Sequence, residues 1–382
     1  MIMARTDVGT VEDLHASASR VTGLDDFGDD DYREGLRVLL ESYAAEAALT
    51  PAGSKVKRAL LRGALVARLL SEAAWQQYPE HAETPITRPV FITGLPRTGT
   101  TALHRLLAAD PANQGLELWL TEVPQPRPPR ETWPDNPVFA AIQDGYRRHR
   151  DNRPELQTAH DISAEQVEEC WQLLRQSMTS VSFECLAFIP GYSSWLRAQD
   201  WRSAYRRHRR QLQLIGMGDA DPRWVLKNPS HLVALPALLD AYPDALVVQT
   251  HRDPRTAIAS VCSLNAQASE GWSEVFRGEA LGRAQLELWA GAVDRFTADR
   301  AGRDPDQFLD VRYDEFVADP MATVAAIYER LGSPLSDEAR AAMAVRAEPE
   351  ARSGRRYALE DFGLSAAAVD ERFAAYLAAQ GR

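Results

Sequence analysis

Residues 90–107 constrain the fold more than any other part of this 382-residue chain. An apolar run at 90–92 enters a glycine-containing turn, and leucines then recur at helical spacing between 103 and 107. This succession predicts a strand, a loop and a helix. Because the first amides and the dipole of a helix N-terminus face an anion, the loop at 94–101 is predicted to bind phosphate.

The loop departs from the usual phosphate-binding pattern at one position. Its glycines have the expected spacing, but Thr100 stands where ATP-binding loops have a lysine. A threonine is too short to reach a γ-phosphate, and the positive charge lies instead at Arg97. We therefore expect a nucleotide with one 5′-phosphoryl group that carries something other than further phosphates.

The overall charge excludes some classes of partner. A net charge of −11 is unsuited to binding nucleic acid or an anionic membrane surface, because both need a basic field. An anionic ligand must then be held by local basic residues. Lysine occurs only at Lys55, Lys57 and Lys227, and Lys227 lies within an otherwise apolar stretch, so it is a candidate functional residue.

Targeting signals and cysteines bear on the compartment. The N-terminus lacks a basic segment followed by an apolar one, and no apolar run approaches the length of a membrane span. Cys170, Cys185 and Cys262 show neither a CxxC pair nor metal-ligand spacing, and their odd number favours a reducing compartment. We expect a cytoplasmic protein without a membrane segment or a metal site.

Further apolar runs at 224–227, 245–249 and 308–311 predict strands that alternate with helices, which is typical of a parallel sheet with helices on both faces. Ligands of such sheets bind at the carboxyl ends of the strands. Arg97, Lys227 and Arg252 each lie at or just beyond such an end. One cleft is therefore predicted to collect all three side chains.

Three segments together resemble the cofactor-binding motifs of the PAPS-dependent sulfotransferases, in particular their bacterial and mycobacterial branch. The segments are Pro96-Arg97-Thr98-Gly99-Thr100-Thr101, then Lys227-Asn228-Pro229-Ser230-His231, then Arg252-Asp253-Pro254-Arg255 with Ser260 eight residues after Arg252. The resemblance continues through Val311-Arg312-Tyr313-Asp314-Glu315-Phe316 and Asp319-Pro320 to Arg355-Arg356-Tyr357. It covers roughly residues 88–363.

The resemblance implies a function and assigns residues to it. The function is transfer of a sulfuryl group from PAPS, 3′-phosphoadenosine 5′-phosphosulfate, to a hydroxyl of a small molecule or glycoconjugate, with release of PAP and without an obligatory metal. The residues that would hold the donor are Arg97, Thr98, Gly99, Thr100 and Thr101 at the 5′ end, Arg252 and Ser260 at the 3′-phosphate, and Arg355 and Arg356 near the end of the chain. Lys227 would neutralise the bridging oxygen as the S–O bond breaks.

The general base is less clearly indicated. Cytosolic family members carry a histidine two residues after the lysine, but here that position is Pro229 and the histidine is His231. Glu117 falls near the place where the tyrosine-protein branch has its glutamate, with Glu122 nearby. His160 is an equal candidate, since imidazole titrates near neutrality and the adjacent aspartate could orient it.

The expected architecture is an α/β fold with a P-loop-like parallel β-sheet of about five strands flanked by helices. Residues 1–85 would form a helical N-terminal cap and 86–335 the core, which includes a proline-rich and helical insertion at 124–215 on the acceptor side. Residues 336–382 would contribute to the nucleotide site. Within the insertion, Val167, Trp171, Leu174 and Met178 are expected on one face of a helix.

Two alternatives stay open at this point. A P-loop kinase or nucleotide hydrolase would be stabilised by Mg-ATP, and a non-catalytic PAP or PAPS binder would bind the donor without transferring its sulfuryl group. The basic cluster at 202–210 is predicted to be a solvated helical face. Neither the acceptor nor the oligomeric state is specified by the sequence.

Overall fold

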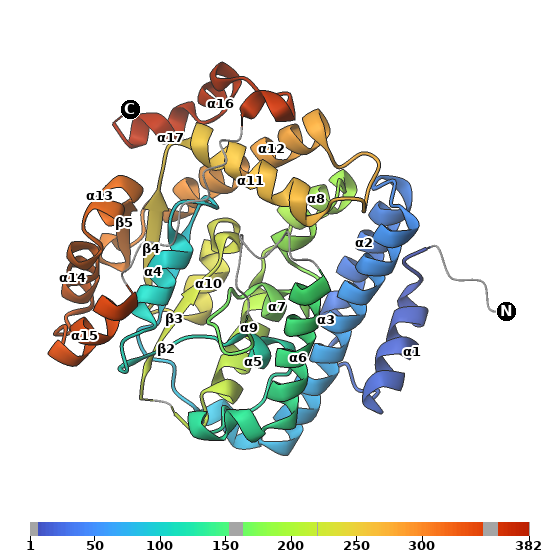
Figure 1. Cartoon of the computed structure of the whole chain (residues 1–382), viewed down its shortest axis with the longest axis horizontal. Coiled ribbons are helices and arrows are strands. Elements are labelled where there is room, and N and C mark those ends of the chain that lie inside the picture. Colours follow the sequence, from blue (N-terminus) through green and yellow to red (C-terminus); the bar gives the residue numbers. More distant parts are fainter. Residues whose placement is uncertain (1–6, 153–162, 220, 347–357, 382) are drawn as a thin grey trace.

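A computed structural model describes residues 7–152, 163–219, 221–346 and 358–381. Five strands form one parallel sheet in the order β2-β3-β1-β4-β5 (Figure 1). Their bounds are β1 Val90–Gly94, β2 Asn113–Gln114, β3 Arg223–Lys227, β4 Leu246–His251 and β5 Phe308–Arg312. The predicted α/β fold with a parallel sheet flanked by helices is therefore confirmed.

The α-helices of the described residues surround this sheet. They are α1 Val11–Thr22, α2 Arg33–Ala45, α3 Pro51–Gln77, α4 Thr100–Leu107, α5 Leu118–Glu122, α6 Pro137–Asn152, α7 Trp171–Arg175, α8 Pro190–Arg197, α9 Arg202–Ile215, α10 Leu235–Ala241, α11 Pro254–Ala268, α12 Gly278–Arg300, α13 Tyr313–Ala318, α14 Pro320–Leu331, α15 Asp337–Arg346, α16 Ala366–Arg372 and α17 Ala374–Ala379.

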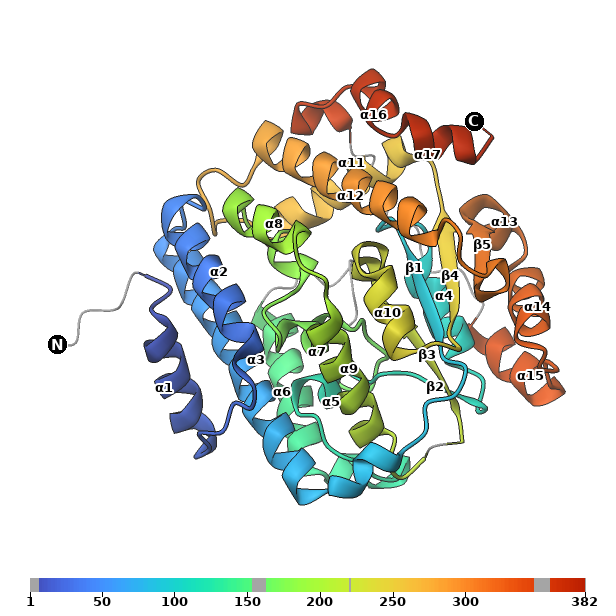
Figure 2. The same cartoon turned by 180° about the vertical axis from the view of Figure 1, so that it is seen from behind.

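The alternation of side chains along β1 explains why helices cover both faces. Successive residues of a strand point to opposite faces, so Val90 and Ile92 enter one buried cluster and Phe91 enters another. Helices α4, α14 and α15 pack on the Val90 face, whereas α9, α10 and α12 contribute to the cluster on the Phe91 face (Figures 1 and 2). A strand that is buried on both faces is apolar along its length and does not alternate between apolar and polar residues.

The N-terminal helices are joined to the rest of the molecule by packing. Leu36 of α2 and Leu65 of α3 are fully buried in the same cluster as Phe91. Helix α3 is capped by Thr50, whose hydroxyl accepts a hydrogen bond from the Gly53 amide. The helical nature of this region agrees with the sequence, while the division into cap, core and C-terminal segment stays a prediction.

Three sequence expectations need correction. The helix expected from Val167 to Met178 is only α7, because Val167 pairs with Glu117 in an isolated bridge and Met178 has a φ of +52°. Strand β2 was not predicted, since its two residues are polar. The basic cluster on α9 is not wholly solvated: Arg207 is buried and forms a 2.6 Å ion pair with Glu72.

None of the helices in the described ranges is both long enough and apolar enough to cross a membrane.

Candidate active site

The loop between β1 and α4 presents a row of free backbone amides. Arg97 and Gly99 adopt positive φ angles of +69° and +87°, which turn the chain sharply into the helix. Among described residues, none accepts a hydrogen bond from the amides of 98–101. An anion at this helix N-terminus would satisfy these donors and interact with the helix dipole.

The loop is fixed to the sheet by threonine hydroxyls. The Thr98 hydroxyl lies 2.6 Å from the Leu95 carbonyl, to which it donates, and 2.5 Å from the hydroxyl of Thr250 on β4. The Thr250 hydroxyl also lies 3.2 Å from the Thr93 carbonyl, so one of the two hydroxyls donates to the other and the second donates to a carbonyl. Because these contacts occupy the Thr98 side chain, this residue can offer an anion its amide but not a free hydroxyl.

Arg97, Arg252 and Ser260 lie close to one another in the structure. Nη1 of Arg252 donates to the Arg97 carbonyl at 2.7 Å, and Nε of Arg97 donates to the Ser260 hydroxyl on α11 at 3.1 Å. The Arg252 guanidinium also lies 4.0 Å from the centre of the Tyr313 ring. Two guanidinium groups and a hydroxyl thus lie beside the loop amides, and this set of donors suits an anion with two separated charged groups.

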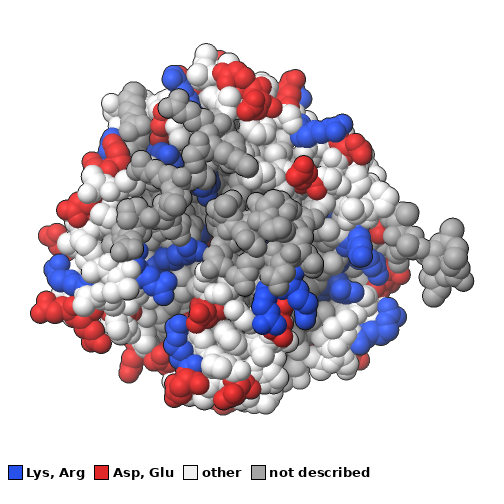
Figure 3. Space-filling view, viewed as in Figure 1, with Lys and Arg blue, Asp and Glu red and all other residues white. Residues whose placement is uncertain are grey.

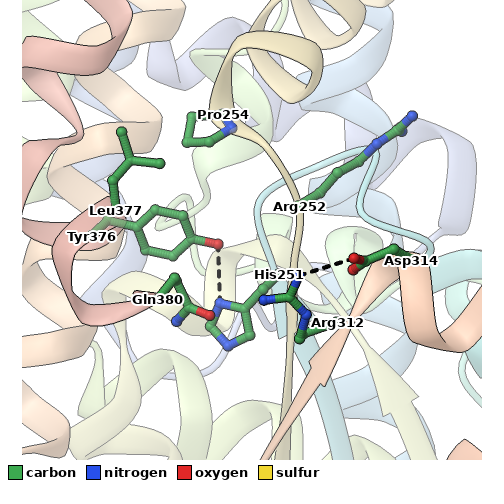
Figure 4. Close-up of a pocket in the computed structure, with 8 residues that line it drawn as sticks. All are labelled: His251, Arg252, Pro254, Arg312, Asp314, Tyr376, Leu377 and Gln380. Carbon is green, nitrogen blue, oxygen red and sulfur yellow. Dashed lines mark hydrogen bonds and ion pairs between the residues drawn. The ribbon is translucent and has the colours of Figure 1, made fainter. Parts of the chain in front are cut away.

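A pocket lies at the carboxyl ends of β4 and β5, under α17 (Figure 4). In this pocket Nδ1 of His251 shares a 3.0 Å hydrogen bond with the Tyr376 hydroxyl. Arg312 forms a 2.9 Å ion pair with Asp314. Figure 4 shows Arg252 extending away from Tyr376 and Leu377. Its guanidinium therefore belongs to the loop side of β4.

Lys227, at the end of β3, links the loop to a carboxylate that the sequence did not reveal. Its side chain is 3% exposed, and Nζ donates to the Thr101 hydroxyl at 3.2 Å and to Oε1 of Glu169. Burial raises the pKa of Glu169, although Lys227 opposes this. Oε2 of Glu169 is buried and has no hydrogen-bond partner within 3.5 Å among the described residues, although the Trp171 side chain is near enough to lower the pKa of Glu169.

Glu169 is a candidate functional residue that sequence reasoning missed. Glu168 and Glu169 form an acidic pair just before the buried residues of α7. Charged residues next to an apolar stretch are the same kind of signal that made Lys227 a candidate. The signal is weak because acidic pairs are common on surfaces. Only the fold brings Glu169 to Lys227, which lies far along the chain.

The two base candidates from the sequence are placed differently. Glu117 occupies the N-cap position of α5 without a side-chain capping bond and is 8% exposed. Its carboxylate forms a 3.0 Å ion pair with Arg127 rather than with Lys227. His160 lies outside the described residues, as do Arg355 and Arg356. His231 is a core residue: its Nδ1 lies 2.6 Å from the Tyr205 hydroxyl, and burial holds its pKa well below the usual range.

Positive charge at the loop comes from particular residues: Arg97 and Arg252 lie beside the loop amides, and Lys227 contacts Thr101. Figure 3 shows basic and acidic side chains both spread over the coloured part of the face seen in Figure 1. Within the described ranges there is no cluster of His, Cys, Asp and Glu with the geometry of a metal site.

Comparison with known proteins defines the class. A profile described as "Sulfotransferase family" matches residues 89–337, a span that contains the loop, Lys227, Glu169, Arg252 and Ser260. The chain belongs to the sulfotransferase family, whose members are enzymes of sulfuryl transfer.

Particular relatives come from mycobacteria. Sulfotransferase STF1 from Mycobacterium tuberculosis H37Rv is 56% identical, with a TM-score of 0.92 over 97% of this chain and 100% of that one. STF9 from Mycobacterium avium is 30% identical, with a TM-score of 0.89 over 99% and 98%. Omega-hydroxy-beta-dihydromenaquinone-9 sulfotransferase Stf3 from Mycobacterium bovis is 26% identical over 66% of this chain, and the match spans 64% of that relative's length.

Proposed function

We propose that this protein transfers the sulfuryl group of PAPS to a hydroxyl acceptor and releases PAP. One observation carries the proposal: the Lys227 ammonium group contacts both Thr101 of the phosphate-binding loop and the Glu169 carboxylate. A cation, an anion-binding loop and a buried carboxylate meet at one point. This arrangement suits the transfer of a charged group from a donor in the loop to an acceptor beside Glu169.

The donor is held at two ends. The free amides of 98–101, with Arg97 and the hydroxyls of Thr100 and Thr101, bind the 5′-phosphosulfate, and Arg252 with Ser260 binds the 3′-phosphate. Arg355 and Arg356 add charge from outside the described residues. The hydrogen bonds between Arg97, Arg252 and Ser260 support this assignment, because they fix the position of the loop relative to the residues that bind the 3′-phosphate.

Transfer forms one S–O bond and breaks another. The acceptor oxygen attacks sulfur, the bond from sulfur to the bridging oxygen breaks, and PAP leaves with the electron pair. Lys227 stabilises the negative charge that develops on the leaving oxygen. The proton of the acceptor hydroxyl passes to a carboxylate in the site.

Glu169 is our choice for that carboxylate. Its unpartnered Oε2 can accept a hydrogen bond from an acceptor hydroxyl, and its raised pKa brings its basicity closer to neutral pH. Glu117 is already paired with Arg127 and is a weaker choice. His160 stays a candidate from the sequence.

The acceptor class is a hydroxyl compound. The printed name of Stf3 describes a menaquinone derivative with an ω-hydroxyl group as the acceptor of that enzyme. For this chain we propose the broader class, a small molecule or glycoconjugate with a free hydroxyl. A cytoplasmic setting is part of the proposal and fits three cysteines that are all free thiols.

Thermal unfolding tests the choice of donor. PAP without metal is expected to raise the midpoint of unfolding, because a ligand that binds only the folded state stabilises it by RT ln(1 + [L]/Kd), which is about 2.7 kcal/mol at a hundredfold excess over Kd. Mg-ATP at equal concentration is expected to have a much smaller effect. Stabilisation by Mg-ATP alone would overturn the proposal in favour of a kinase or nucleotide hydrolase. Transfer of label from PAPS to a hydroxyl compound then separates an enzyme from a passive binder.

A further inference from the structure

The short connection between β4 and α11 is held on both sides by the C-terminal helices. Arg252, the proposed ligand of the 3′-phosphate, lies in this connection. Just before it, His251 shares a hydrogen bond with Tyr376 of α17. Just after it, Arg255 pairs with Asp370 of α16. One distant part of the chain therefore contacts the residues on either side of Arg252.

Both nitrogens of the His251 ring are engaged. Nε2 lies 2.8 Å from Oδ1 of Asp310 on β5, and Nδ1 lies 3.0 Å from the Tyr376 hydroxyl. Burial would raise the pKa of Asp310, but hydrogen bonds from His251 and Arg300 and the charge of Arg300 hold this pKa well below its usual range. An ionised carboxylate can only accept, so Nε2 donates to it, and Nδ1 of the neutral ring accepts from Tyr376. The ring thus joins β5 to α17.

Open space adjoins the His251 ring. A hollow of about 400 Å³ lies between α12, β5 and α17, and His251, Asp310 and Tyr376 are among the residues that line it. His251 and Tyr376 also line the pocket in Figure 4. The Tyr376 ring stacks on His251 with 5.7 Å between the ring centres. With space beside it, the His251 ring depends on this stacking and on its two hydrogen bonds to keep its orientation.

The orientation of His251 bears directly on that of Arg252. Successive side chains of an extended chain point to opposite sides, and Figure 4 shows Arg252 extending away from Tyr376 whereas the His251 ring faces it. On its own side, Nη1 of Arg252 donates to the Arg97 carbonyl of the phosphate-binding loop at 2.7 Å. A rotation of the chain at the end of β4 would therefore move the Arg252 guanidinium away from the loop.

A second contact holds the other end of the connection. Nε of Arg255 donates to Oδ1 of Asp370 at 2.6 Å, and Nη2 donates to Oδ2, so the pair is bidentate. Helix α16 is itself joined to α12, because Arg372 pairs with Asp294 at 2.8 Å. Since the Arg255 side chain is 50% exposed, we expect this pair to contribute less than the buried His251. The C-terminal helices are thus fixed to the core and support 251–255 at two points.

We propose that helices α16 and α17 position Arg252 through His251 and Arg255, and so set how tightly the enzyme binds the 3′-phosphate of its donor. The inference rests on the proposed function and deepens it. His251 and Tyr376 are positioning residues, which act on the donor through Arg252. Such coupling is reciprocal: if docking of α17 strengthens binding of the 3′-phosphate, the bound 3′-phosphate stabilises the docked α17 by the same factor.

Two nucleotides separate the 3′-phosphate from the rest of the donor. PAP and AMP share the adenosine and the 5′-phosphate, and only PAP carries a 3′-phosphate. The ratio of their dissociation constants, measured by titration calorimetry, therefore reports on the 3′-phosphate site alone. The proteins are wild type, His251→Ala, His251→Gln, Tyr376→Phe and Asp370→Asn. The controls are His15→Gln, at a histidine that contacts the Tyr32 hydroxyl far from the donor site, and Tyr78→Phe, which removes a hydroxyl that accepts from Gln77.

His251→Ala is expected to raise the dissociation constant for PAP about tenfold and that for AMP by less than about twofold. His251→Gln should restore most of the loss, because its amide can donate to Asp310 and accept from Tyr376. Tyr376→Phe should weaken PAP about threefold and Asp370→Asn about twofold, again with little effect on AMP. Both controls should leave the ratio of the two constants unchanged.

Two further measurements distinguish positioning from a general loss of structure. At saturating PAPS, the single-turnover rate of each variant should stay within about threefold of the wild type, because the groups at the transferred sulfuryl are untouched. In hydrogen exchange, PAP should protect the amides of 374–379 in the wild type more than AMP does, and this difference should shrink in Tyr376→Phe. Tyr376→Phe, which removes a single hydroxyl, tests the same link if His251→Ala does not fold.

The outcomes separate the inference from the function on which it rests. An unchanged ratio of the PAP and AMP constants in His251→Ala or in Tyr376→Phe would overturn the inference. Equal protection of α17 by PAP in the wild type and in Tyr376→Phe would overturn it as well. A wild type that binds neither nucleotide, or binds both equally, would instead contradict the proposed donor site itself.

Discussion

At the scale of single residues, the catalytic proposal depends on one buried lysine. Lys227 is one of three lysines in the chain, and it is the one whose ammonium group touches both the phosphate-binding loop and a carboxylate. Arginine could not replace it easily, because a planar guanidinium differs in size and in the direction of its donors from a compact ammonium group.

Lys227→Met is expected to lower the single-turnover rate of sulfuryl transfer by about 10²–10³-fold, because the charge on the leaving oxygen loses its stabilising cation. The dissociation constant for PAP should change little, since the loop amides, Arg252 and Ser260 still hold the phosphates. Rapid-quench measurements with labelled PAPS give the rate, and titration calorimetry gives the affinity. Lys55→Ala, which alters an exposed lysine, serves as the control. Full activity of Lys227→Met would remove Lys227 from the mechanism.

Glu169→Gln is expected to abolish the rise of transfer rate with pH. In the wild type the rate increases as Glu169 loses its proton, and the increase comes at a higher pH than for an ordinary glutamate because burial raises this pKa. Single-turnover rates between about pH 5 and pH 9 would show the profile. Glu165→Gln, at an exposed carboxylate paired with Arg130, should leave it intact.

The same series distinguishes the base candidates. Glu117→Gln breaks a mostly buried ion pair with Arg127, so it should lower stability more than it changes the pH profile. A pH rise that persists in Glu169→Gln and disappears in Glu117→Gln would reverse our assignment.

At the scale of elements, the unit that matters is the strand, loop and helix at 90–107. Gly94 ends β1 with a φ of +141°, and a Cβ there would lie 2.5 Å from both oxygens of Thr250. The chain can thus enter the loop only because a residue without a side chain stands at the end of the strand. Contacts between β1 and β4 then fix where the loop amides point.

Gly94→Ala is expected to lower the free energy of unfolding by about 2–4 kcal/mol, from the strained backbone and the clash with β4. Gly63→Ala is the matched control, because its Cβ would meet nothing within 4 Å on the exposed face of α3. That change should stabilise the protein by about 0.5–1 kcal/mol. Urea denaturation measures both, and a Gly94→Ala protein as stable as the wild type would show that the loop can relax.

The sequence predicted the elements whose signals are local. Strands β1, β3, β4 and β5 are apolar runs, and their ends carry Arg97, Lys227 and Arg252, so both the sheet and the positions of these cations could be inferred. Strand β2 could not, because two polar residues give no pattern. Glu169 could not be inferred either, since its role follows from a contact with Lys227 that only the folded chain creates.

At the scale of the whole molecule, the N-terminal helices share their core with one face of the sheet. Leu36, Leu65, Phe91 and Trp289 belong to one continuous buried cluster. Such shared packing favours a single cooperative transition over independent unfolding of a cap and a core. If the molecule unfolds in one transition, residues 1–85 and the sheet are one cooperative unit despite the predicted division at residue 85.

Leu65→Ala is expected to reduce the free energy of unfolding by about 2–5 kcal/mol and to do so for the entire molecule, because its side chain is fully buried in the shared cluster. Far-UV circular dichroism and tryptophan fluorescence should report one common midpoint. Val21→Ala, at a side chain that is 61% exposed, should change it little. Separate midpoints for helices and sheet would show two independent units.

The position of β1 at the centre of the sheet also has a consequence for biosynthesis. Val90 pairs with Val225 of β3 and with Leu246 of β4, so neither neighbour exists until at least 135 further residues have been made. At about 5–20 residues per second, the ribosome needs roughly 7–27 seconds for that stretch. Throughout this interval an apolar strand with two unpaired edges is present on the nascent chain. We therefore expect the strand that carries the phosphate-binding loop to be a binding site for chaperones during translation.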